Sequence, residues 1–370
     1  MMDQSRIFVN KQPQFDVPVS TWKRVTVDYS ESIIGLWEGV SSVEGGYGDE
    51  NHRWLFDPNG TYTYYNRTDS GWVLSPNTLN EYAVDGDFLA FRWKADASSK
   101  MDREWWDVEM QGDSIMLWTG IRTNEDGSRY TSSFKLRRVS PTRKEIEKYI
   151  VGKWITESTD NTPMLTNAKS GHTFLPNGIV EYTIASAGEH GGEWYNQLSL
   201  SYNLYGNFLV ESGKDNHGTT VEPYRSHFNA INEKTMSVLS VVGKRMGDIT
   251  LRRVSDDINY AEDIIGTWEG IASSNGEYGD YHHRWQYATD GSYQYMNWEN
   301  DEWVPVATNK GQYMVDGDWM ACRWTNTEGG MDYEWWDISI KNDTMRWDAL
   351  RADATGKTFR AWFTMKRVKK

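Results

Sequence analysis

The chain contains almost no cysteine and little histidine. Cys322 is the single cysteine among 370 residues, so no disulfide can form within the chain, and a disulfide-stapled secreted module is excluded. The seven histidines are scattered, and the adjacent pair His282 and His283 would point to opposite faces of a strand. We therefore predict no metal site and no cofactor, and we interpret Cys322 as a buried, unreactive thiol.

Long apolar runs are also missing. No stretch approaches the roughly 20 apolar residues that a membrane-spanning helix needs. The first residues, MMDQSRIFVNKQPQFDVPVS, show neither the apolar region nor the small-residue cleavage site of a signal peptide. We expect cytoplasmic synthesis without a signal peptide, and no membrane span.

Motifs of common enzyme classes are absent. The sequence contains no nucleophile elbow, no phosphate-binding loop and no zinc-protease motif. Glu104 and Asp107 are close in sequence, but three residues apart in a strand they would face opposite sides and could not flank one glycosidic bond. We therefore expect a protein that is not an enzyme.

Acidic and aromatic residues are abundant. The chain has 53 acidic and 39 basic residues, giving a net charge of −14, which repels phosphate backbones and argues against nucleic-acid binding. It also has 20 Trp, 21 Tyr, 11 Phe and 32 Gly, a composition that favours strands joined by tight turns.

The sequence repeats itself. Residues 101–107 read MDREWWD and residues 331–337 read MDYEWWD, and the match extends over most of residues 33–140 and 264–369, for example IIGLWEGV against IIGTWEGI. A weaker middle copy opens with YIVGKW, closes with ITLRRVS and lacks the Glu-Trp-Trp-Asp stretch. We predict four segments: an N-terminal arm at 1–31 and three domains at 32–140, 141–255 and 256–370.

Within each copy, short apolar segments alternate with turn sequences such as DPNG, VDGD and NEDG. Seven to nine such strands in about 105 residues indicate an up-and-down meander that closes into a barrel or folds as a sandwich. SPTRKEIEKY at 140–149 and SDDINYAED at 255–263 indicate short helical linkers. The predicted fold is all-β, with three tandem antiparallel up-and-down β-barrel domains joined by such linkers.

Each copy begins with Gly-x-Trp and ends with an Arg about 100 residues later. This pattern resembles the lipocalin/calycin superfamily, and the hairpins resemble short lipocalin-like domains of Bacteroidetes proteins. The resemblance implies that each Trp packs against its Arg and closes the base of the barrel, where cation–π attraction contributes about 0.5–2 kcal/mol. The pairs are Trp37 with Arg138, Trp154 with Arg253 and Trp268 with Arg367.

The tryptophan doublets divide between two faces of a strand. Alternation places Trp106 and Trp336 in the core, and Trp105 and Trp335 on a face with acidic neighbours. One hypothesis is a site for a sugar or for a planar or anionic ligand in each of the two similar copies. Its residues would be His52, Arg92, Trp105 and Asp107, and His283, Arg323, Trp335 and Asp337. The alternative is that these are packing tryptophans and Arg–carboxylate pairs across neighbouring strands.

Two functions remain open at this stage. The first is a non-catalytic structural or interaction protein, part of a larger assembly such as a phage virion (a tail or neck-associated component), docked on protein partners or on itself through residues 1–31. The second is a calycin-type carrier of a lipid, a sugar or a tetrapyrrole. A lumen of roughly 300 Å³ or more would favour the carrier. The many tryptophans favour filled lumens, and hence the first function.

Overall fold

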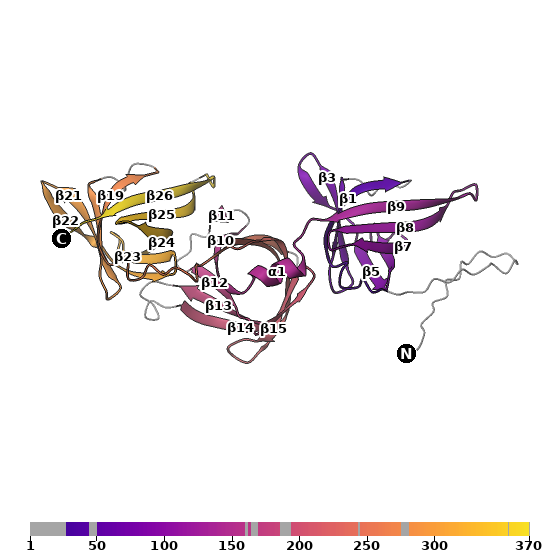
Figure 1. Cartoon of the computed structure of the whole chain (residues 1–370), viewed down its shortest axis with the longest axis horizontal. Helices are drawn as coiled ribbons and strands as arrows, with labels where there is room; N and C mark the ends of the chain where they lie inside the picture. Colours follow the sequence, from indigo (N-terminus) through magenta and orange to yellow (C-terminus); the bar gives the residue numbers. More distant parts are fainter. Residues whose placement is uncertain are drawn as a thin grey trace. The chain divides into compact units, whose positions relative to one another are not determined.

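The computed structural model describes residues 27–43, 50–159, 162–163, 169–185, 194–242, 245–274, 281–353 and 355–369. The chain divides into two compact units, one formed by residues 1–143 with 205–208 and the other by 144–204 with 209–370. Most of the arm predicted at 1–31 lies outside the described residues. The all-β prediction is confirmed, since 26 strands and a single helix make up the described part of the chain (Figure 1).

The first sheet is a curved meander of nine antiparallel strands in the order β4-β3-β2-β1-β9-β8-β7-β6-β5. Its edges approach each other at one isolated bridge between Thr61 and Glu81. The strands are β1 (Gly35–Val43), β2 (His52–Phe56), β3 (Tyr62–Thr68), β4 (Gly71–Leu74), β5 (Leu79–Asp85), β6 (Phe88–Lys94), β7 (Asp102–Gln111), β8 (Ile115–Thr123) and β9 (Arg129–Arg138).

The second sheet closes into an eight-stranded barrel because β10 pairs with both β12 and β18, and the two-residue β11 lies at its side. In Figure 1 the helix α1 (Arg143–Tyr149) lies across this barrel, and its Ile146 is buried in the core with Trp154. The strands are β10 (Gly152–Thr159), β11 (Thr162–Pro163), β12 (Lys169–Phe174), β13 (Ile179–Ala185), β14 (Trp194–Tyr205), β15 (Phe208–Lys214), β16 (Thr220–Ile231), β17 (Thr235–Val242) and β18 (Arg245–Arg253).

The third sheet is a closed barrel in which each strand pairs with the next and the first pairs with the last. The strands are β19 (Gly266–Ser273), β20 (His283–Tyr287), β21 (Ser292–Glu299), β22 (Glu302–Asp316), β23 (Trp319–Thr325), β24 (Met331–Lys341), β25 (Thr344–Ala352) and β26 (Thr358–Arg367).

Two parts of the predicted architecture differ from the structure. Closed barrels are found in the second and third sheets, whereas the first sheet is open between β4 and β5. The third sheet crosses the corresponding stretch with one long strand, β22, which includes Pro305, whereas in the first sheet residues 75–78 between β4 and β5 belong to no strand. Of the two predicted helical linkers, residues 143–149 form α1, whereas residues 255–263 form turns.

The first and last strands of every sheet meet in the same way. The guanidinium carbon of Arg138 lies 4.2 Å from the ring centroid of Trp37, and the corresponding distances are 4.4 Å for Arg253 and 4.3 Å for Arg367. Each Trp also pairs with its Arg in the ladder. Two or three residues after each Trp, the register shifts at a β-bulge, which bends the first strand and favours closure.

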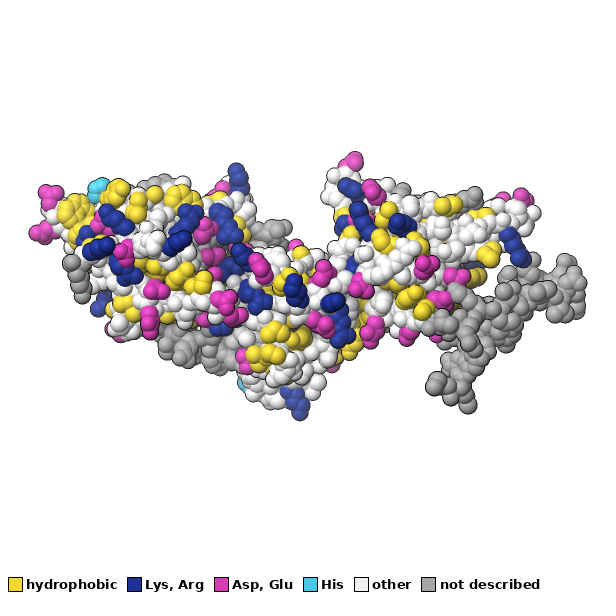
Figure 2. Space-filling view, viewed as in Figure 1, with side chains coloured by type: hydrophobic (Ala, Val, Ile, Leu, Met, Phe, Trp, Pro, Cys, Tyr) yellow, Lys and Arg dark blue, Asp and Glu magenta, His cyan; other side chains and the backbone are white. Residues whose placement is uncertain are grey.

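The described surface carries both signs of charge. On the face shown in Figure 2, basic and acidic side chains are interspersed over the strands. No helix in the described part of the chain is both long and apolar enough to cross a membrane.

Candidate ligand-binding cavities

The first and third sheets enclose matching aromatic cavities. The cavity of the first sheet has a volume of about 240 Å³ and that of the third about 340 Å³. Their walls correspond position by position, because the two sequence copies place the same residue types on the inner faces of equivalent strands. The shared pairs are Trp54 and Trp285, Tyr62 and Tyr293, Tyr64 and Tyr295, Trp93 and Trp324, Trp118 and Trp347, Phe134 and Phe363, and Glu104 and Glu334.

An accessible carboxylate lies in the wall of each aromatic cavity. Glu104 on β7 has a side chain 37% exposed, and its Oε1 lies 3.3 Å from Nη2 of Arg122. Glu334 on β24 is likewise 37% exposed and lies 3.8 Å from Nη2 of Arg351. Burial raises the pKa of Glu334, and the positive charge of Arg351 acts in the opposite direction. Each cavity therefore offers a ligand a flat aromatic wall and one acidic acceptor.

The arginines that accompany these carboxylates are fixed from several sides. Arg122 donates to the backbone oxygen of Trp105 at 3.0 Å, and its guanidinium lies 4.0 Å from the ring centroid of Trp106. Arg351 donates to the oxygen of Trp335 at 2.8 Å and lies 4.4 Å from the ring of Trp336. The second tryptophan of each doublet thus supports the Arg that faces the cavity carboxylate.

The walls of the two aromatic cavities are not identical, since Ser75 and Asn77 line only the first and Tyr287 lines only the third. Phe56 and Phe91 of the first sheet correspond to Tyr287 and Cys322 of the third. Cys322 takes less space than Phe91 at the equivalent wall position, and the third cavity is the larger of the two. Cys322 is 6% exposed, and burial raises the pKa of its thiol. The prediction that this thiol is buried is confirmed.

The second barrel encloses a third, larger cavity of about 450 Å³ with a different wall. The equivalent positions are found by counting back from the closing Arg of each copy. Ile249 occupies the place of Phe134, and Val238, which pairs with it, occupies the place of Trp118. Aliphatic side chains therefore stand where the other two sheets have aromatic rings, and the lumen of the second barrel is the larger.

The lumens are not filled, although the tryptophan count predicts that they are. Trp37, Trp106 and Trp118 are fully buried, yet cavities of about 240, 340 and 450 Å³ remain inside the three sheets. Two of the three exceed the roughly 300 Å³ at which ligand pockets begin. The aromatic side chains form the walls and the closed ends of the lumens and leave space between them.

The four residues predicted as a site in the first copy do not converge. Arg92, Trp105 and Asp107 share the outer face of the sheet, where Trp105 is 55% exposed and Arg92 pairs with Glu81. His52 lies on the inner face, where its Nδ1 contacts the hydroxyl of Tyr64 and its ring stacks on the tyrosine at a centroid distance of 5.7 Å. A ligand-binding role for the outer three stays a prediction.

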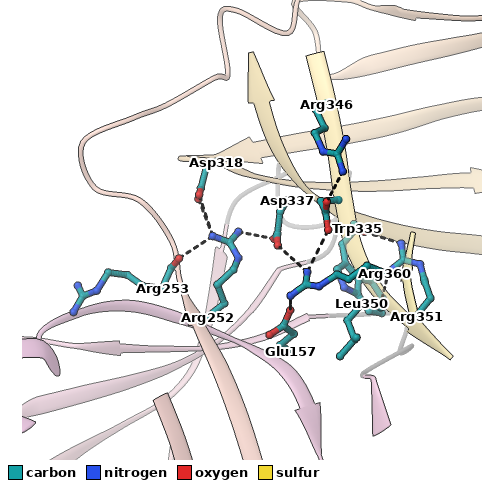
Figure 3. Close-up of polar contacts among 11 residues, drawn as sticks. Glu157, Arg252, Arg253, Asp318, Trp335, Asp337, Arg346, Leu350, Arg351 and Arg360 are labelled. Atoms are coloured by element: carbon teal, nitrogen blue, oxygen red, sulfur yellow. Dashed lines mark hydrogen bonds and ion pairs between the residues drawn. The ribbon is translucent and has the colours of Figure 1, made fainter. Parts of the chain in front are cut away.

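The equivalent residues of the third copy meet the second barrel instead of an open surface. Trp335 is 9% exposed and packs with Ile155 and Val254 of the second barrel. Asp337 lies 2.8 Å from Nη2 of Arg252, which also contacts Asp318 at 3.0 Å (Figure 3).

The other two predicted residues of the third copy have partners within their own barrel. Arg323 donates to Gln312 at 3.0 Å, and His283 contacts the hydroxyl of Tyr295. His283 is again the inner-face member of its set. Among the eight predicted residues, His52 and His283 contact the wall tyrosines Tyr64 and Tyr295, and none of the eight lines a cavity itself.

Sequence reasoning did not find the arginines beside the cavity carboxylates, nor the wall tryptophans. Arg122 and Arg351 follow the wall residues Trp118 and Trp347 by four positions in the two similar copies. That repeated spacing is a usable signal, since residues four apart on a strand share a face. Among the described residues, no group of three or more His, Cys, Asp or Glu side chains is arranged to hold a metal ion.

Comparisons with known proteins give distant structural likenesses. No protein-family model and no curated protein matches the chain. A transferrin binding protein B double mutant from Haemophilus parasuis aligns with 94% of this chain and 74% of its own, at 11% identity and a TM-score of 0.19. A DUF3598 protein of unknown function from Nostoc punctiforme aligns with 93% of this chain and 100% of its own, at 10% identity and a TM-score of 0.18. Similarity at this level carries no argument about function.

Proposed function

We propose that this chain is a non-catalytic binding protein whose first and third sheets each hold one planar aromatic ligand that carries a positive charge or hydrogen-bond donors. The observation that carries the proposal is the repeated cavity, in which an accessible glutamate lies in an aromatic wall at equivalent positions of two sheets. Aromatic walls favour stacking of a flat ring, and the carboxylate fixes its orientation. This use of the lumen agrees with what the lipocalin-like resemblance implies.

The test is calorimetric titration of the intact chain with proflavine, a planar cation with amino donors. Anthracene carboxylate, which has three fused rings and the opposite charge, is the matched comparison. We expect proflavine to bind at two sites and the anion to bind at least tenfold more weakly, because proflavine brings amino donors to the wall carboxylates and the anion brings none. Replacing both carboxylates in the Glu104→Gln/Glu334→Gln variant removes a charged hydrogen bond of about 1.5–3 kcal/mol at each site, a loss of tenfold or more in affinity.

Trp105→Ala on the outer face is the control, and we expect it to leave proflavine binding unchanged. Equal affinity for both compounds, or an unchanged affinity in the double glutamine variant, would contradict the proposal.

A second candidate function is protein association through an outer face. The observation in its favour is that the Trp335 face of the third barrel is covered by protein in the second unit, whereas the same heptapeptide in the first sheet leaves Trp105 55% exposed. Light scattering of the intact chain and of the Trp105→Ala variant tests this candidate. A complex that the substitution dissociates supports it, and a monomer in both cases speaks against it. The narrower idea of a virion component stays a prediction from the sequence.

A further inference from the structure

The second barrel contains a carboxyl group that the aromatic cavities lack. Glu211 on β15 is 1% exposed and lines the cavity of about 450 Å³. The position of Glu211 in the sheet can be found from the turn that precedes its strand. Each of the three sheets has a glycine with positive φ in this turn, namely Gly86, Gly206 and Gly317. The residue five positions after that glycine is Phe91 in the first sheet, Glu211 in the second and Cys322 in the third. An apolar wall position of the other two sheets is therefore a glutamate here.

One oxygen of this carboxyl group is partnered and the other is not. The Tyr182 hydroxyl donates to Oε2 of Glu211 at 2.7 Å. Oε1 is buried and has no hydrogen-bond partner among the described residues. A buried acceptor without a partner destabilises a folded protein, and it does so more strongly when it is charged. A ligand that brings a donor into the cavity would remove that cost.

The remaining wall sets the chemistry of such a ligand. Apart from Glu211, the ionisable groups facing the cavity are His172 on β12, Tyr182 on β13, and Glu222 and Tyr224 on β16. Burial lowers the pKa of His172 to about 4, so its ring is neutral near pH 7. Neither lysine nor arginine lines this cavity among the described residues, so the formal charges that a ligand would meet are negative.

Apart from Phe174 and Ser226, the rest of the wall is aliphatic. Its aliphatic members are supplied by five strands, and they include Leu198, Leu200, Leu209, Val238, Ile249 and Leu251. A flexible alkyl chain fills such a wall well, whereas the flat aromatic pair of the other cavities is missing because Val238 and Ile249 replace Trp118 and Phe134.

We infer that the second barrel binds an aliphatic amine, with the alkyl chain among the leucines and the ammonium group on Glu211. This site is independent of the two aromatic cavities and takes a different class of ligand. The ammonium supplies the donor that Oε1 lacks and the positive charge that the acidic wall favours.

The affinity for the amine should depend on pH through the ionisation of Glu211. Burial raises the pKa of Glu211 to about 7, and the hydrogen bond from Tyr182 partly offsets that effect. The ammonium pairs with the ionised form, so affinity rises with pH until Glu211 is fully ionised. From a pKa of about 7, the ionised fraction falls roughly 100-fold between about pH 8 and about pH 5, and the affinity should fall with it.

The experiment is calorimetric titration of the intact chain with octylamine, octanol and octanoate, which share one chain length and differ in the head group. We expect octylamine to bind at one site at about pH 8, at least tenfold more tightly than octanol or octanoate. In Glu211→Gln we expect a loss of tenfold or more in octylamine affinity and no remaining pH dependence between about pH 5 and about pH 8.

Glu334→Gln is the matched control, because it removes a cavity carboxylate from the third barrel and should leave octylamine binding unchanged. The inference is overturned if octylamine does not bind, if octanoate binds as tightly, or if Glu211→Gln binds octylamine as the unaltered chain does. Loss of octylamine binding in Glu334→Gln with retention in Glu211→Gln would place the amine in the aromatic cavity and would also overturn it. Proflavine titration of the same variants separates these results from failure of the aromatic sites.

Discussion

At the scale of single residues, buried polar groups distinguish the three lumens. Glu104 and Glu334 are held by arginines and stay accessible, whereas Glu211 is buried with a tyrosine as its partner. Both of the first two carboxylates can accept a hydrogen bond from a ligand in the lumen. Glu211 destabilises the free protein when it is ionised, and this strain makes it a candidate for ligand recognition.

Glu211 should make the stability of the second barrel depend on pH. Its folded pKa of about 7 lies above the ordinary value of 4.5, so the folded state holds its proton more tightly than the unfolded chain does. The penalty is absent below about pH 4.5, grows as the pH rises, and reaches its full size above about pH 7; at 1.36 kcal/mol per unit it amounts to about 3 kcal/mol.

We therefore expect Glu211→Gln to be about 1–3 kcal/mol more stable than the unaltered chain at about pH 8 and nearly equal to it at about pH 4.5. Native-state hydrogen exchange of the β15 amides measures the local free energy of opening. A difference between variant and unaltered chain that does not change with pH would show that Glu211 is not strained.

At the scale of elements, the first strand of each sheet explains the Gly-x-Trp pattern. Gly152 has φ of +133°, a backbone conformation that residues with a side chain rarely adopt. A Cβ at this position would overlap Nη1 of Arg253, the guanidinium that covers Trp154. The glycine thus allows the arginine to approach the indole, and the Arg then donates to the backbone oxygen of Val151 at 2.7 Å.

Gly152→Ala should destabilise the second barrel through both the backbone and the displaced arginine. Gly218→Ala is the matched control, since Gly218 also has a positive φ of +80° but no neighbour within 4 Å of its Cβ position. We expect the alanine at 152 to cost about 1–3 kcal/mol more than the alanine at 218. Urea unfolding of the two variants measures the difference, and equal costs would rule out a steric role for Gly152.

Strand alternation was sufficient to divide the tryptophan doublets correctly. Trp106 and Trp336 are 1% and 2% exposed, as the predicted inner face requires. The same reasoning failed to assemble a site, because alternation fixes which residues of one strand share a face but not which face the next strand presents. His52 was therefore grouped with Arg92, although the register turns His52 inward and Arg92 outward.

Other features depended on contacts that no single strand encodes. The wall carboxylates and their arginines come from β7 with β8 and from β24 with β25, and they meet only because neighbouring strands pair in register. Likewise, the bends and turns of residues 255–263 and the break between β4 and β5 depend on contacts with neighbouring segments that the sequence of one strand does not show. The pairing of each Gly-x-Trp with its Arg could be predicted from the sequence, because the up-and-down strand order brings the first and last strands of each copy together.

At the scale of the whole molecule, one sequence motif occupies two environments. In the second unit, the second barrel covers Trp335 with an apolar cluster and surrounds it with ion pairs of Arg252 and Arg360 (Figure 3). In the first sheet, the equivalent Trp105 is 55% exposed. The two copies share six of the seven residues of this motif, and their surroundings differ.

These two tryptophans are therefore a natural matched pair. Trp335→Ala should cost about 3 kcal/mol or more, because it opens a cavity between the second and third barrels. Trp105→Ala should change the free energy of unfolding by no more than about 0.5 kcal/mol, as is usual for an exposed position. Urea unfolding of both variants checks this, and similar costs would show that the barrel contact contributes nothing to stability.

Native mass spectrometry of the intact chain with proflavine tests the central claim most directly, because it counts bound molecules. We expect two sites in the unaltered chain, a fall in occupancy at one of them in the Glu334→Gln variant, and a fall at both in the Glu104→Gln/Glu334→Gln variant, each corresponding to a tenfold or greater loss in affinity. No bound proflavine, or a count that both substitutions leave unchanged, would contradict a binding role for the aromatic cavities.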